Sequence, residues 1–158
     1  MIIKRLEAKA INDTRGDKTI EVELYCEYGK FKASAPNGKS KGKYEVSPWK
    51  KSINEDIEEI NNTSKFSIDF NKFEDLKKVE NKFKRKIGGN SLIAIEYCFL
   101  KALAFKERKE VWQIILKDKR EIKVPRMVAN IIGGGAHSKS ELKPEFQEFH
   151  VIPKADAK

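Results

Sequence analysis

The residues most able to do chemistry lie in the stretch 124–153. An apolar run there ends in three glycines, Gly133–Gly135, which lead to His137, and a second apolar run opens around Gln147 and Glu148. Consecutive glycines lose much conformational entropy on folding, so they are typical of places where the backbone needs a positive φ or approaches something closely. We predict two strands flanking a loop whose polar groups meet a ligand. The alternative is a glycine-softened hairpin that carries His137 and Glu148 on its surface.

A second loop of interest covers residues 35–45 and reads APNGKSKGKYE. It carries two glycines, the hydroxyl group of Ser40 and three lysines. We interpret it as a mobile, cationic loop that presents a hydroxyl group. A solvated connection between two elements is the alternative, because surface loops are generally polar.

Length and composition bound the class of protein. The 158 residues, 39% of them hydrophobic, indicate one ordinary domain with a core, plus an appendage. No apolar run approaches the length of a membrane span, and the N-terminus lacks the apolar core of a signal peptide. We therefore expect a cytoplasmic protein without membrane contact. Cys26 and Cys98 fall in segments typical of buried elements, so we assign both to packing.

The net charge of +9 raises a second class of function, a non-catalytic basic module that binds nucleic acid or another protein. The lysines form only modest clusters, within 39–51, 82–86 and 117–123, and acidic residues lie between most of the others. No aromatic platform is interleaved with them, so nucleic acid is not the partner that we expect. A site for an anionic substrate explains the charge equally well.

The chain begins with a predicted sheet and continues with helices. Apolar residues alternate with polar ones three times within residues 2–35, which predicts a three-stranded antiparallel meander with turns at 13–17 and 27–30. The third and longest helix, from 91 to about 106, is apolar nearly all round, which is typical of a central helix. A helical turn over 111–116 and a linker over 117–123 follow. The expected helix starts are Ser52 with Glu55 as a capping box, Asn71 with Glu74, and Asn90.

Strands followed by helices on one sheet face describe an α+β domain of about 115 residues. The C-terminal hairpin then has no helix left to cover it. Its eight large apolar residues would each gain roughly 1.5–3 kcal/mol from full burial, so leaving them exposed forgoes on the order of 10 kcal/mol. The hairpin is therefore expected to need a partner or a missing remainder of the chain.

Four segments resemble the enolases, in the family's order. IKRLEAKAINDTRGDKTIEVEL and the loop APNGKSKGKYE are similar to a D-S-R-G-N-P-T-V-E-V segment followed by a P-S-G-A-S-T-G loop. KRKIGGNSLIAIEYCFLKALA is similar to the L-G-A-N-A-I-L-A-V-S-L-A helix, and MVANIIGGGAHSKSELKPEFQEFHVIP to M-N-I-I-N-G-G-S-H-A leading to Q-E-F-M-I-x-P. The resemblance implies a capping domain over residues 1–118 and, over 119–158, the first two strands of an enolase-type barrel that another chain completes.

The activity that the resemblance implies is a lyase reaction, phosphopyruvate hydratase. A lysine base removes a proton beside a carboxylate of 2-phosphoglycerate, two Mg²⁺ ions stabilise the intermediate, and phosphoenolpyruvate forms. Loops of the capping domain close over the site and exclude water. The resemblance also implies an enolase-type dimer of the assembled protein, because Arg15 and Glu21 match residues near the family's subunit contact.

The site residues follow from the resemblance position by position. Ser40 matches the serine that helps to hold the second Mg²⁺, and His137 matches the loop histidine that approaches the substrate on closure. Gln147 matches a substrate contact, and Glu148 matches the carboxylate near the leaving hydroxyl group. His150 replaces a residue that is usually apolar in the family, and we interpret it as a packing change.

Departures from the family pattern concern both loops and the extent of the chain. Asn37, Lys39 and Lys41 replace two small residues and a threonine of the first loop, and Gly133 and Ala136 replace Asn and Ser of the second. The base lysine, the acidic Mg²⁺ ligands and the catalytic acid are expected on a separate C-terminal barrel chain. The protein would then be the N-terminal subunit of a split enolase, inactive alone. A paralogue that works without a barrel and a truncated form are the alternatives.

Overall fold

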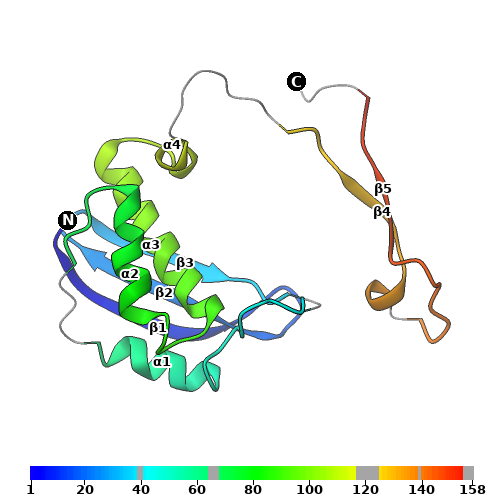
Figure 1. The fold of residues 1–158 in the computed structure, drawn as a ribbon, viewed down its shortest axis with the longest axis horizontal. Helices are drawn as coiled ribbons and strands as arrows, with labels where there is room; N and C mark the ends of the chain where they lie inside the picture. The colour runs from blue at the N-terminus through cyan, green and yellow to red at the C-terminus, as the bar shows by residue number, and fades with distance from the viewer. Residues whose placement is uncertain (39–40, 64–67, 117–124, 139, 155–158) are drawn as a thin grey trace. The chain divides into compact units, whose positions relative to one another are not determined.

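A computed structural model describes residues 1–38, 41–63, 68–116, 125–138 and 140–154. These residues form two compact units, Met1–Lys117 and Asp118–Lys158. The first unit is an α+β domain and the second is built around a two-stranded hairpin, as the ribbon in Figure 1 shows. The predicted fold class is confirmed.

The sheet of the first unit is the predicted antiparallel meander, with strand order β1-β2-β3. Alternating apolar residues of these strands face the helices. In the β1–β2 turn, the Asp13 carboxylate accepts hydrogen bonds from the backbone N–H groups of Arg15 and Asp17, at 2.8 and 2.9 Å. The strands are β1 (Ile3–Asn12), β2 (Lys18–Cys26) and β3 (Gly29–Ala35).

Among the described residues of the first unit, four α-helices and a short 3₁₀ helix follow the sheet. In Figure 1 the long α3 runs across the sheet, where it contacts β2 and β3, and α1 packs along β1. Helices α2 and α4 contact α3 in turn. The bounds are α1 (Ile53–Asn61), η1 (Phe73–Asp75), α2 (Leu76–Phe83), α3 (Gly89–Glu107) and α4 (Val111–Ile115).

One hydrophobic core lies between the sheet and the helices. Phe70 and Phe99 meet edge to face at its centre, with ring centroids 4.9 Å apart, which is a favourable geometry for aromatic pairs. Cys26 and Cys98 are buried free thiols, as the sequence predicts, and burial raises the pKa of Cys98 to about 12. The largest fully buried side chains described are Phe70, Phe83, Phe99, Ile20, Leu24, Ile60, Ile95 and Leu103.

Helix α3 is packed on several sides, although one stripe of it is exposed. Its contacts with the sheet, α2 and α4 account for the buried apolar residues. Ile93 and Tyr97 are nevertheless about half exposed, at 47% and 48%. The described residues of the first unit therefore leave part of the apolar surface of α3 uncovered.

Two of the three predicted helix starts are wrong. Ser52 does cap α1, accepting a hydrogen bond from the Glu55 N–H at 3.2 Å. Helix α3, however, begins at Gly89 with Gly88 as the N-cap residue, not at Asn90. The reason is that Asp56 accepts the N–H of the N-cap residue Gly88 and the carbonyls of residues 47 and 48 accept the first two N–H groups of α3, so no local cap is needed.

The start of α2 is also organised differently from the prediction. Asp75, rather than Asn71 with Glu74, satisfies this turn: one carboxylate oxygen accepts from the N–H groups of Asn71 and Lys72 at 2.8 and 3.1 Å. The other oxygen lies 2.7 Å from the ammonium group of Lys78. These contacts, the Lys78 hydrogen bond first and the Asn71 N–H next, lower the pKa of Asp75 to about 2.

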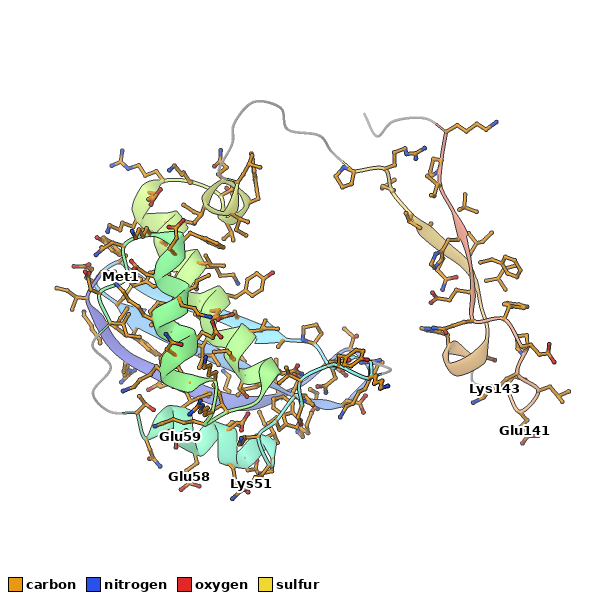
Figure 2. The ribbon with its side chains drawn as sticks, viewed as in Figure 1. Met1, Lys51, Glu58, Glu59, Glu141 and Lys143 are labelled. Carbon is orange, nitrogen blue, oxygen red and sulfur yellow. The ribbon has the colours of Figure 1, made fainter. Side chains whose placement is uncertain are left out.

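The second unit contains the predicted hairpin. Strands β4 (Ala129–Gly133) and β5 (Glu148–Val151) pair antiparallel, and η2 (Gly135–His137) follows β4. The register places Asn130 opposite His150 and Gly133 opposite Glu148, with an irregularity after Asn130. Figure 2 shows Glu141 and Lys143 in the loop between η2 and β5. The proposed linker 117–123 lies outside the described residues.

No helix in the described parts of the chain has both the length and the apolar composition needed to span a membrane.

Candidate active-site loops

The glycines after β4 build a tight turn against the chain's own backbone. A Cβ atom on Gly134 would lie 2.3 Å from the Phe146 carbonyl oxygen, and the Gly134 N–H donates to the Gln147 carbonyl at 2.7 Å. Gly135 has a φ of +47°, which glycine adopts most readily. The predicted close approach and positive φ are both present. Within the protein, the close approach of Gly134 is to the Phe146 carbonyl group.

This turn brings the imidazole of His137 to the start of β5. Its Nε2 lies 3.2 Å from Oε1 of Glu148 and 3.3 Å from Nε2 of Gln147. One ring nitrogen cannot donate to a carboxylate and accept from an amide at the same time. The bond to the carboxylate is charge-assisted and therefore stronger. We accordingly assign the proton to Nε2 of His137, with Glu148 as its acceptor and Gln147 as a neighbour of the ring.

Gln147 and Glu148 both approach His137, although strand parity predicts that neighbours point to opposite faces. The reason is that β5 begins only at Glu148, so Gln147 still belongs to the turn. Its carbonyl accepts the Gly134 N–H there. Three of the four predicted site residues are thus close together in the second unit.

The Glu148 carboxylate has two further donors that the sequence does not predict. Asn130 Nδ2 donates to Oε1 at 2.9 Å, and His150 Nε2 lies 3.0 Å from Oε2. The interpretation of His150 as a packing change is therefore wrong, because its half-exposed ring contacts a carboxylate and not a core. Spacing alone could have shown this contact, since residues i and i+2 of a strand share a face.

The first loop is anchored at its beginning by Asn37. The Asn37 side-chain amide donates to the Lys18 carbonyl at 2.7 Å and accepts from Asn90 Nδ2 at 3.1 Å. Its own carbonyl accepts from Arg15 Nη2 at 2.5 Å. One residue thus ties the loop to the β1–β2 turn and to the start of α3.

The segment between this loop and α1 is anchored by Asp56, which is 1% exposed. Its carboxylate accepts from the N–H groups of Lys50 and Gly88, at 3.1 and 2.8 Å, and from the Ser91 hydroxyl at 2.6 Å. A charged side chain buried so deeply is stable because its oxygens are bonded. Between the two anchors is a hollow of about 210 Å³ lined by Asn37, Gly38, Lys41, Glu45, Pro48, Trp49 and Asn90.

Ser40, the predicted metal ligand, lies outside the described residues, so its position is untested. The described residues contain no cluster of three or more His, Cys, Asp or Glu side chains able to hold a metal ion.

Many lysines of the first unit face carboxylates. Lys84 and Lys86, from one of the lysine clusters, pair with Glu80 and Glu59 at 3.9 and 2.9 Å. On the outer face of the sheet, Lys9 bridges to Glu21 at 3.0 Å. Acidic side chains therefore interrupt the basic surface at these positions.

Comparison with known families supports the resemblance seen in the sequence. The model of the family "Enolase, N-terminal domain" matches residues 3–115. The matched segment runs from β1 to α4 and includes the loop that carries Ser40, whereas His137, Gln147 and Glu148 lie beyond it. Because the match covers more than half of the chain and the meander and helices are in place, the protein belongs to the enolase N-terminal domain family.

Proposed function

We propose that this chain supplies active-site loops for the Mg²⁺-dependent dehydration of 2-phosphoglycerate to phosphoenolpyruvate. It does so in a complex with a chain that carries the rest of an enolase-type barrel. The observation that carries the proposal is the grouping of His137, Gln147 and Glu148 at one end of the hairpin. The family match supports the lyase lineage, and it covers the loop that carries Ser40.

The described side chains suit binding and orientation of an anionic, hydroxylated substrate. His137 is one-third exposed, so its ring can reach a bound phosphate group. An imidazolium beside a phosphate gains a charge-assisted hydrogen bond. Glu148 offers a carboxylate that can accept a hydrogen bond from the leaving hydroxyl group, and Gln147 offers an amide for a polar substrate atom. Proton abstraction requires a base that the complementary chain provides.

Magnesium enters the proposal through Ser40 and through ligands on the complementary chain. Hydroxyl and carbonyl oxygens are ligands that Mg²⁺ accepts, but one serine is far short of its octahedral set. The described residues offer no such set, so no step of the reaction is assigned to the metal here. Asn37 anchors the start of the loop that carries Ser40, and Asp56 anchors the segment between that loop and α1.

The hairpin supports the need for a complementary chain. Its large apolar side chains are exposed, which is unfavourable for two strands standing alone, and a two-stranded hairpin is marginally stable in water. Neighbouring strands of a barrel would cover both edges and one face. The exposed residues of this unit include Met127, Val128, Ile131, Ile132, Phe149, Val151 and Ile152.

The test is reconstitution with a chain that carries the remaining barrel strands. Mixing the two chains with Mg²⁺ is expected to produce phosphoenolpyruvate from 2-phosphoglycerate, followed by absorbance, while this chain alone produces none. Ser40→Ala and His137→Ala are each expected to lower kcat at least about tenfold while the complex still forms. The reason is that the proposal assigns Ser40 to the second Mg²⁺ and His137 to the substrate, and neither residue to the contact between the chains. A stable stoichiometric complex without turnover would refute the proposal.

Two controls separate catalysis from assembly. Ser138→Ala changes a hydroxyl group beside His137 that the proposal does not use, and it is expected to leave kcat within about twofold. Equal loss of complex formation in Ser40→Ala or His137→Ala would reassign that residue to structure. The basic-module alternative is not adopted, because the described lysine clusters are interrupted by ion pairs.

A further inference from the structure

Three donors from three elements surround the carboxylate of Glu148. Asn130 on β4 and His137 on η2 share Oε1, at 2.9 and 3.2 Å. His150 on β5 contacts Oε2 at 3.0 Å. An ionised carboxylate has about four acceptor positions, so three of them are filled by the protein.

The backbone explains why these groups meet. Glu148 and His150 are two residues apart on β5 and therefore share a face of the hairpin. The register places Asn130 directly opposite His150 on the same face. Gly133, opposite Glu148, has no side chain, and a Cβ atom there would lie 3.4 Å from the Cβ of His137. Gly133 therefore lies beside the start of the His137 side chain.

We infer that His150 is a positioning residue for Glu148 in the proposed reaction. Its Nε2–H holds Oε2 and so fixes the plane of the carboxylate, while the two donors on Oε1 fix its other end. The acceptor position left on Oε2 is the one available to a substrate hydroxyl group. This role rests on the proposed function, and it gives the carboxylate one orientation before the substrate binds.

Two substitutions distinguish hydrogen bonding from packing. His150→Met removes the donor and installs a side chain of similar size, whereas His150→Gln keeps an N–H donor at similar reach. Lys154→Met is the matched control, because it makes a polar-to-apolar change at an exposed position just beyond β5.

The first measurement uses the full chain alone. The Glu148 carboxyl carbon is observed by NMR in protein labelled with ¹³C-glutamate, and Glu148→Gln assigns its resonance. We expect His150→Met to move this resonance and His150→Gln and Lys154→Met to leave it near its wild-type position. A resonance that does not move in His150→Met would overturn the inference, whatever the assembled enzyme does.

The second measurement uses the chain assembled with the rest of the barrel. His150→Met is expected to lower kcat about tenfold with KM within about twofold, and His150→Gln is expected to restore most of the loss. Equal loss in both variants, or a rise in KM alone, would contradict a positioning role. If the assembled wild type shows no turnover, the proposed function fails, and the resonance of Glu148 still decides whether His150 holds it.

Discussion

At the scale of single residues, buried or partly buried carboxylates organise much of this protein. Asp56, Asp75 and Glu148 each accept several donors from different segments. Such groups stabilise a structure only while all their donors are present, because an unpaired buried charge is costly. Each of the three therefore fixes the position of the segments that it joins.

Asp75 gives a pH dependence whose sign follows from its lowered pKa. Its pKa is about 2 in the folded protein and roughly 3.9 in an unfolded chain, so the unfolded state binds more protons between these values. The stabilisation is therefore present above about pH 4 and is lost as the pH falls toward 2. We expect Asp75→Asn to lower the free energy of unfolding by about 2 kcal/mol at pH 7 and by little near pH 2. Urea unfolding at several pH values measures this.

Neighbouring lysines provide the control for this prediction. Lys78 pairs with Asp75 at 2.7 Å, whereas Lys77 pairs with the more exposed Glu80 at 2.6 Å. Lys78→Met should reproduce part of the Asp75→Asn effect, and Lys77→Met should change stability by less than about 1 kcal/mol, as surface pairs do. If the two lysine variants behave alike, the Lys78 ammonium group is not the main cause of the lowered pKa.

Sequence reasoning located the candidate residues better than it located their partners. His137, Gln147 and Glu148 were predicted and lie together, because a strand, a turn and a strand close in sequence must fold back on each other. Asn130 and His150 were missed as partners of Glu148. The contact of Asn130 depends on the register of β4 with β5, and the irregularity after Asn130 that sets it leaves no recognisable signal in the sequence. The contact of His150 could have been predicted, because residues i and i+2 of a strand share a face.

At the scale of elements, the meander and the helix order followed from periodicity, whereas two helix starts did not. A capping motif is local, so Ser52 was predicted correctly. The start of α3 depends on Asp56, which is 32 residues from Gly88 in the chain. Long-range partners of this kind replace a local cap, and no pattern within one segment reveals them.

Asp56 joins three elements, so its removal should affect the loop before α1 as well as stability. In Asp56→Asn the amide nitrogen cannot accept from the backbone N–H groups of Lys50 or Gly88. We expect a loss of about 2 to 3 kcal/mol in the free energy of unfolding, measured by urea denaturation.

The matched control is Glu58→Gln. Figure 2 shows Glu58 on the same helix, on the side facing away from the sheet, and its side chain is exposed. This variant should change stability by less than about 0.5 kcal/mol. A loss of the same size in both variants would mean that the buried hydrogen bonds of Asp56 do not stabilise the fold more than an exposed carboxylate does.

The turn after β4 needs Gly134 because the chain passes close to its Cα, and it needs Gly135 because of its positive φ. Gly134 allows the sharper test. A methyl group on Gly134 would overlap the Phe146 carbonyl oxygen, 2.3 Å away, and the Pro144 ring. Gly134→Ala should therefore open the turn and separate His137 from Glu148. A Cβ atom on Gly133 would lie 3.4 Å from His137 Cβ and 4.0 Å from Asn130 Nδ2, which are ordinary contact distances, so Gly133→Ala should be tolerated.

The readout for both glycine variants is the contact that the turn creates. Nuclear Overhauser effects between the His137 ring and the side chain of Glu148 should disappear in Gly134→Ala and remain in Gly133→Ala. In the assembled enzyme the first variant should lose at least about tenfold in kcat, as the His137→Ala variant does. A Gly134→Ala protein that keeps the Overhauser effects and the wild-type kcat would show that the turn does not position the site.

At the scale of the whole molecule, the two units differ in how they bury apolar surface. All of the clustered core residues, from Leu6 to Leu103, belong to the first unit. The hairpin leaves its large apolar residues exposed among the described residues. The sequence predicts this difference, because the helices that follow the meander are expected to cover the sheet, and no helix is predicted after them to cover the hairpin.

This difference predicts that the units respond differently to a complementary barrel chain. In the chain alone, backbone amides of β4 and β5 should exchange with deuterium within seconds, because a lone hairpin opens readily, while those of β2 and α3 exchange slowly. Adding the complementary chain should slow exchange in β4 and β5 by at least about a hundredfold, because barrel neighbours would then hold both strand edges. Ile131→Ser, which removes an exposed apolar side chain, should weaken that protection without altering exchange in β2. Slow exchange of the hairpin in the isolated protein would instead mean that its apolar residues are already covered, and the need for a barrel partner would disappear.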